Sequence, residues 1–125
     1  SALDFRKLAT AMPYVGSAAA ALGFNLEEVL ALMGQLSNTG LASSTVGTSL
    51  RKIFLLLADS SSKLSKSFKE PVRDLPTLLK GLKELKLNNT ELGEALELTD
   101  IRSVIAFQSL IEGADKEHEF SLQQF

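Results

Sequence analysis

The sequence predicts an all-α protein built of several short helices that pair as helical hairpins. Apolar side chains recur every three or four residues in successive segments, a spacing that places them on one face of a helix. No segment shows the sustained alternation of polar and apolar residues that a half-buried strand requires. Hydrophobic residues make up 45% and charged residues 22% of the 125 residues, which is the ordinary range of globular proteins.

The first helical pattern runs from Leu3 to Val15 and contains Pro13. Proline lacks an amide donor, so we expect the helix to kink or restart there. An Ala-rich continuation ends at Gly23, the residue type favoured for a left-handed helix stop. Asn25 and Glu28 then form a capping-box pattern that begins the next helix. Its predicted apolar stripe is Leu26, Val29, Leu30, Met33 and Leu36.

A turn at Asn38-Thr39-Gly40 separates this helix from the following one. Ser43 or Ser44 is expected to cap the following helix. Leu55 and Leu56 widen its apolar surface, so we expect cover on more than one side. The residues on its main apolar face are Val46, Leu50, Ile53, Phe54 and Leu57.

Two glycines lie inside these neighbouring helices, Gly34 in one and Gly47 in the other. Each costs about 1 kcal/mol relative to alanine in a helix interior. Close approach of the two backbones would compensate for that cost. We therefore expect Gly34 and Gly47 to face each other.

Three further helices are predicted in the second half. Residues 59–67 are polar and Ser-rich and are expected to form a loop or a frayed helix, the best candidate for a mobile hinge. Asp74 is expected to cap the next helix, with Pro76 in its first turn. Later caps are Asn88-Asn89-Thr90, before a short helix from Glu91 to Leu98, and Thr99-Asp100, before a last helix. The two longer helices have the apolar stripes Leu75, Leu78, Leu79, Leu82 and Leu85, and Ile101, Val104, Ile105, Phe107, Leu110 and Ile111.

The predicted organisation has three parts. Residues 1–59 form a helical core, residues 60–74 a polar hinge, and residues 75–125 a second helical part of the same domain that becomes charged after Gly113. The abrupt ends and the lack of a starting methionine suggest a piece of a longer chain. Neither a secretory signal nor an apolar stretch long enough to cross a bilayer is recognisable, so we expect no membrane contact in this segment.

Charge is divided unevenly between the two halves. Nine of the 13 basic residues lie between Arg51 and Lys86, whereas eight acidic residues and only Arg102 and Lys116 follow Lys86. A solvated face on each half is one interpretation. The other is a charge-complementary contact between the halves or between neighbouring copies. The net charge of −2 does not call for nucleic acid as a partner.

We expect no catalytic, metal-binding or cofactor-binding residues, and no enzyme. The chain has no cysteine, and its one histidine, His118, lies between two glutamates, where it is expected to be a surface residue. Glu91, Glu94 and Glu97 are spaced as a solvated stripe rather than as two acids across a cleft. No glycine-rich phosphate-binding motif is present.

The segment from Leu26 to Leu57 reads as helix, turn, helix, and one alternative is a helix-turn-helix DNA-binding regulator. Its second helix begins with small hydroxyl residues and carries Arg51 and Lys52, which could contact phosphates. Gly47 weakens that helix, however, and the run Leu55-Leu56-Leu57 calls for burial. An ordinary packed helical hairpin is therefore favoured, with a generic helical adaptor as a further alternative.

The stretch from Tyr14 to Leu57 resembles the core region of phage tail tape measure proteins. Five elements recur in register with the pattern of that family. They are the small-residue helix Ala18–Gly23, the capped segment Asn25–Glu28, the turn Asn38–Gly40, the segment Gly47–Arg51 and the apolar segment Ile53–Leu57. The part from Leu75 onward is similar more loosely, and the stretch from Ser60 to Ser67 and the basic run beyond it have no clear counterpart in the family.

This resemblance implies a structural role in the virion. Tape measure proteins are long, largely helical chains whose length sets the length of the tail tube. The implied partners are the rest of the tape measure chain, tail tube proteins and tail assembly chaperones. The implied location is the phage tail, or the bacterial host cytoplasm when the gene is in a prophage. The broad apolar face from Ile53 to Leu57 adds the expectation that this segment self-associates or packs on other parts of its chain.

Overall fold

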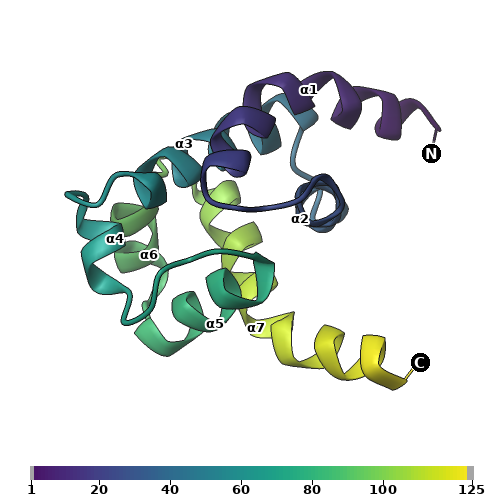
Figure 1. Cartoon of the computed structure of the whole chain (residues 1–125). Helices are drawn as coiled ribbons and strands as arrows, with labels where there is room; N and C mark the ends of the chain where they lie inside the picture. Colours follow the sequence, from purple (N-terminus) through teal and green to yellow (C-terminus); the bar gives the residue numbers. More distant parts are fainter. Residues whose placement is uncertain (1, 124–125) are drawn as a thin grey trace.

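The computed structural model describes the backbone of residues 2–123 and the side chains of residues 6–113. Within that part the chain forms helices and connecting turns and contains no strand, which confirms the all-α prediction. The helices, drawn in Figure 1, are α1 (Ala2–Ala21), α2 (Leu26–Asn38), α3 (Ser43–Ala58), α4 (Lys63–Ser67), α5 (Leu75–Leu85), α6 (Asn89–Leu96) and α7 (Ile101–Gln123).

Local signals determine most helix ends as predicted. Gly23 after α1 and Gly40 after α2 have φ angles of +91° and +95°, a backbone region that residues other than glycine rarely adopt. At the start of α2 the Asn25 side chain accepts a hydrogen bond from the Glu28 amide at 2.7 Å, and the Glu28 carboxylate accepts one from the Asn25 amide at 3.1 Å. Asp74 caps α5 in the same way, and Asn88 caps α6.

Of the two outcomes predicted at Pro13, a kink or a restart, the structure shows no restart. Pro13 lies inside the continuous helix α1, and Figure 1 shows the axis changing direction in its second half. Leu8 and Val15, on either side of the proline, are both buried, so tertiary packing holds the two halves together. The predicted cap of α3 is wrong: Ser43 is already the first residue of the helix, and the N-cap position is held by Ala42, whose side chain cannot accept a hydrogen bond.

The predicted contact between Gly34 and Gly47 is also wrong. A Cβ atom added to Gly34 would meet no atom within 4 Å, whereas one added to Gly47 would lie 2.9 Å from the Cβ atom of Ala11. Gly47 therefore permits close approach of α3 to α1 rather than to α2. The pairing of α1 with α3 is the most extensive helix contact in the described part of the chain.

The buried apolar side chains form one cluster to which all of these helices contribute. Near its centre the rings of Phe24 and Phe54 lie 5.0 Å apart between centroids. The predicted main face of α3 is buried in full. The α2 stripe is only partly correct: Leu26 is exposed and Leu32 is buried instead, because α2 packs against α1, α3, α5 and α7 and not against one neighbour.

The polar segment after α3 contains the short helix α4 rather than an unstructured loop. Ser62 caps it, and the hydroxyls of Ser62 and Ser65 donate hydrogen bonds to the carbonyls of Leu56 and Leu57 at the end of α3. The side chain of Leu64 in α4 is buried. The division of the chain into residues 1–59, 60–74 and 75–125, with a mobile middle part, stays a prediction.

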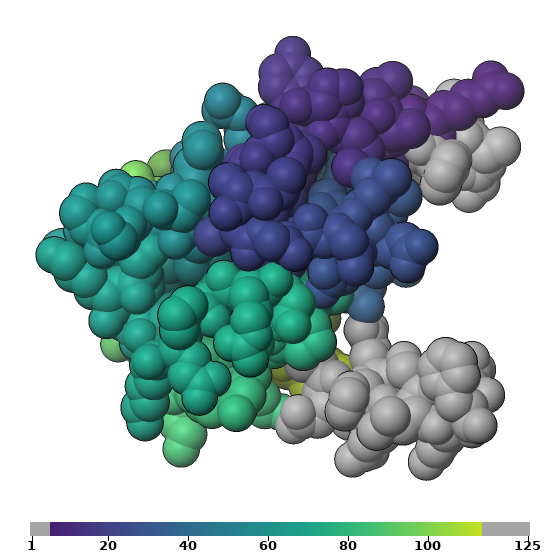
Figure 2. Space-filling view, in the orientation of Figure 1, coloured from purple at the N-terminus to yellow at the C-terminus, as the bar shows by residue number. Residues whose placement is uncertain are grey.

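The second half packs back on the first. The predicted stripe of α5 is buried at Leu78, Leu79 and Leu82. A link that the sequence did not suggest joins the two halves, because Glu28 also accepts a hydrogen bond from the amide of Leu75 at 2.8 Å. Figure 2 shows α2 and α5 meeting in one continuous surface.

The last helix differs from its predicted apolar face. Val104, Phe107, Leu110 and Ile111 are buried, whereas Ile101 and Ile105 are exposed. The backbone remains helical beyond Gly113 to the end of α7, and the charged side chains predicted there lie outside the described ones.

Candidate interaction surface

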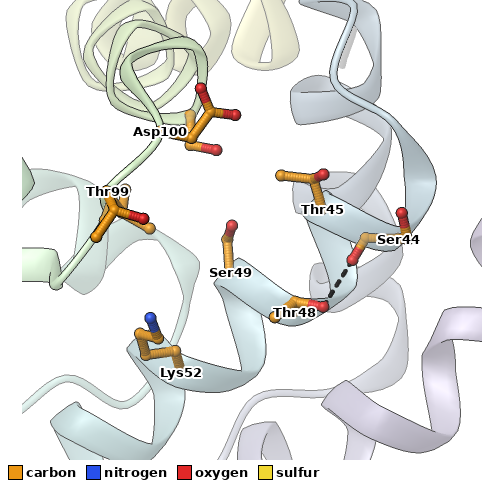
Figure 3. A pocket seen from close by; sticks show the side chains of 9 residues that line it. Ser44, Thr45, Thr48, Ser49, Lys52, Thr99 and Asp100 are labelled. Atoms are coloured by element: carbon orange, nitrogen blue, oxygen red, sulfur yellow. Dashed lines mark hydrogen bonds between the residues drawn. The ribbon is translucent and has the colours of Figure 1, made fainter.

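Two adjoining grooves lie where α3 meets the connection between α6 and α7. The first, which we name the hydroxyl groove, has a volume of about 260 Å³. It is lined by Lys52, Leu98 and Asp100 and by six hydroxyl side chains, namely Ser44, Thr45, Thr48, Ser49, Thr99 and Ser103. Figure 3 shows Ser49 pointing into the space between Thr45 and Asp100.

The hydroxyl groove contains two buried serines. Ser49 is 6% exposed and Ser103 is 2% exposed, and neither hydroxyl has a hydrogen-bond partner among the described residues. Both oxygen atoms are open to the groove rather than fully enclosed, so water or a ligand can bind them there. Thr48, by contrast, donates to the carbonyl of Ser44 at 2.8 Å.

Asp100 occupies the helix end that faces this groove. Its carboxylate accepts from the Arg102 amide at 3.0 Å, and its carbonyl accepts from the amides of Ser103 and Val104. This confirms the predicted cap at Thr99-Asp100. Because one residue already binds these amides, little of the positive end of the α7 dipole is left for an anion.

The second groove, which we name the acidic groove, has a volume of about 550 Å³ and shares Lys52, Leu98 and Thr99 with the first. Its other lining residues include Thr90, Glu94, Glu97 and Ile101. Lys52 is the one basic side chain of either lining, and its ammonium group donates to the carbonyl of Glu97 at 3.0 Å. The two linings together contain three carboxylates, those of Glu94, Glu97 and Asp100, and one ammonium group, that of Lys52, so the combined surface has a net negative charge.

Exposed apolar side chains accompany these polar surfaces. Ile101, at the rim of the acidic groove, is 59% exposed, and Ile105 follows one turn later on α7. Tyr14 is exposed at a third hollow, of about 630 Å³, between α1 and the start of α3. Isolated exposed apolar residues are common on protein surfaces. Apolar residues beside a groove contribute to the binding of a partner when the partner covers them.

No catalytic arrangement is evident in these grooves. They offer hydroxyls, carboxylates and one ammonium group, which suit binding, but no hydroxyl of their described linings is hydrogen-bonded to a carboxylate. The same residues include no group of three or more potential metal ligands. Glu91, Glu94 and Glu97 are all exposed, as predicted for a solvated stripe. The side chain of His118 lies outside the described ones.

Most residues of the helix-turn-helix alternative lie at the hydroxyl groove, but Arg51 is exposed outside its lining. Ser44, Thr48 and Ser49 line it, and Lys52 is held at the end of α6. Sequence reasoning treated Thr99 and Asp100 only as a cap and gave no sign that α3 would face them. Within the described part, none of the helices is long and apolar enough to cross a membrane.

Comparison with known proteins identifies the family. No curated protein and no solved structure matches the chain. One family model, described as phage-related minor tail protein, matches residues 1–109. This match includes α1 to α6 and the first part of α7. It supports a structural role in the virion tail, with other tail proteins as partners. The chain therefore belongs to the phage-related minor tail protein family.

Proposed function

We propose that this chain is a segment of a tape measure protein that helps to set tail length and to assemble the tail within the tail tube. The observation that carries the proposal is the agreement between the family match over residues 1–109 and the five elements between Tyr14 and Leu57 that resemble the tape measure core. All five coincide with helix starts, turns or buried helix faces.

The surface features support an assembly role that involves no catalysis. Grooves without a catalytic centre and exposed side chains such as Tyr14 and Ile101 are suited to contacts with other proteins. The partners in this proposal are the rest of the tape measure chain, tail tube proteins and tail assembly chaperones. The protein would occur in the virion tail and, when its gene lies in a prophage, in the host cytoplasm during assembly.

The three-part division has a corresponding role in this proposal. Residues 60–74 would let residues 1–59 and 75–125 separate when the chain changes from a compact form to an extended one in the tube. The hydrogen bonds of Ser62 and Ser65 to the end of α3 are only partly buried. Separation would also expose apolar side chains of the cluster that both parts share, so the extended form needs other tail proteins to cover them.

Tail length is the measurement that tests the proposal. In-frame deletions in the gene that encodes this chain should shorten the tails by about 1.5 Å for each deleted helical residue. Electron microscopy of tails from several deletion lengths would give the slope. Tails of unchanged length would refute the length-setting role while leaving membership in the tail family intact.

A further inference from the structure

We infer that the acidic and hydroxyl grooves of one copy bind the basic segment 63–86 of a second copy, with a lysine or arginine side chain entering the space between Ser49 and Asp100. The inference deepens the proposed tail role by naming a contact between copies. It concerns purified protein in solution, so its failure would leave the tail-length proposal to be decided by its own experiment.

The chemistry of the groove favours a cationic group. Ser49 and Ser103 are buried residues whose hydroxyl oxygens open to the groove and have no protein partner among the described residues. A hydroxyl oxygen has lone pairs that accept hydrogen bonds. One Asp100 carboxylate oxygen accepts from the Arg102 amide, which leaves the other able to accept from a ligand. A lysine ammonium offers three donors and an arginine guanidinium five, and neither can accept.

An anionic or neutral ligand fits less well. Glu94, Glu97 and Asp100 would repel an anion, and the single ammonium group, that of Lys52, already donates to the carbonyl of Glu97. The amides of Arg102, Ser103 and Val104 at the start of α7 already donate to Asp100 and are not available to an oxyanion. A neutral polar ligand would gain nothing from the surplus negative charge.

Charge complementarity identifies the second copy as the occupant. Residues 63–86 contain seven basic and three acidic side chains, a net charge of +4, whereas residues 87–113 contain one basic and five acidic side chains, a net charge of −4. No residue of 63–86 lines either groove, so the two regions cannot neutralise each other there. Lys69 and Lys80 are exposed, and neither forms an ion pair within the described residues.

The geometry indicates how such a contact would be stabilised. Ion pairs at an exposed surface contribute little by themselves, but complementary surfaces set orientation and exclude wrong partners. Ile101 at the rim of the acidic groove adds an apolar side chain that a second copy would cover. Because the groove and the basic segment are different surfaces, the contact is heterologous and each copy can use both.

Sedimentation velocity on the purified chain tests this contact. Wild type should associate as its concentration rises from micromolar to millimolar, and raising NaCl should weaken association about tenfold. Glu94→Lys/Glu97→Lys and Lys69→Glu/Lys80→Glu should each weaken it about tenfold or more. An equimolar mixture of these two variants should associate again, because each groove then meets a segment of opposite charge. Glu27→Lys/Glu112→Lys changes the charge equally outside the grooves and is the matched control.

The pocket itself is tested by smaller changes. Asp100→Asn keeps a good helix cap but removes the charge, and Ser49→Ala removes only a hydroxyl. Each should weaken association about fivefold and leave the melting temperature close to that of wild type. A wild-type chain that stays monomeric, an association insensitive to salt, or no recovery in the mixture would overturn the inference. Monomers that bind polylysine through the groove would also overturn it, since the occupant would then be another basic protein.

Discussion

The close approach of α3 to α1 can be tested with a pair of glycine substitutions. Gly34 and Gly47 both lie inside helices, so replacing either by alanine should gain about 1 kcal/mol from helix propensity. At Gly34 no atom lies within 4 Å of the new Cβ atom, and the full gain is expected. At Gly47 the new atom would lie 2.9 Å from the Ala11 Cβ atom, which is attached directly to the backbone of α1 and cannot rotate away.

The expected difference follows from that contact. Overpacking in a well-packed interior typically costs about 1–3 kcal/mol. Because the propensity gain is the same at both sites, Gly47→Ala should be less stable than Gly34→Ala by about 1–3 kcal/mol. For a chain of this size each kcal/mol corresponds to a shift of about 3–5 °C in melting temperature. Urea unfolding followed by far-ultraviolet circular dichroism would measure both variants.

A double-mutant cycle separates the contact from other effects. Ala11→Gly removes the Cβ atom that the new side chain meets, and the nearest other atom of Ala11 is 3.9 Å away, an ordinary contact distance. In that background Gly47→Ala should therefore stabilise the chain, with a coupling of about 1–3 kcal/mol. Equal stabilisation by Gly34→Ala and Gly47→Ala in the wild-type background would refute the reasoning.

Three other predictions concern helix ends. Glu28→Ala should lower the unfolding free energy by about 1–3 kcal/mol, because it removes the acceptor for the Leu75 amide as well as half of a capping box, and Glu28→Gln should cost less. Hydrogen bonds from the amide and hydroxyl of Thr77 lower the pKa of Asp74 below the ordinary value of about 3.9. The stabilisation by this carboxylate is therefore present at neutral pH and is lost as the pH falls through the lowered pKa. Acid unfolding curves of Asp74→Asn should lack that loss of stability. Lys86 ends α5 with φ of 50°, so Lys86→Gly should raise the melting temperature by a few degrees and Lys86→Val should lower it.

The positive φ angle at Glu97 also explains why the end of α6 was predicted less accurately than the ends of α1 and α2. Glycine follows α1 and α2 and marks their ends in the sequence, whereas α5 and α6 end on residues that do not favour the left-handed region. The end of α6 came two residues before the predicted Leu98. The amide of Leu98 instead donates to the carbonyl of Gly93 and closes the turn.

The sequence by itself determined the helices and most of their starts. Capping boxes at Asn25 and Asn88 and the stop at Gly23 act between residues at most a few positions apart, so they can be read without knowing the fold. The periodic apolar faces of α3 and α5 were equally readable, because burial of the same helix face recurs every three to four residues.

Only the tertiary structure decided which helix each face meets. Pro13 is retained in a continuous helix because α1 packs extensively on α3, and Gly47 approaches Ala11 rather than Gly34 for the same reason. Leu26 and Ile101 have the spacing expected of buried residues, yet both are exposed in the folded chain. The two grooves combine α3 with residues some 50 positions later, and such contacts arise from the packing of whole helices, which local patterns do not encode.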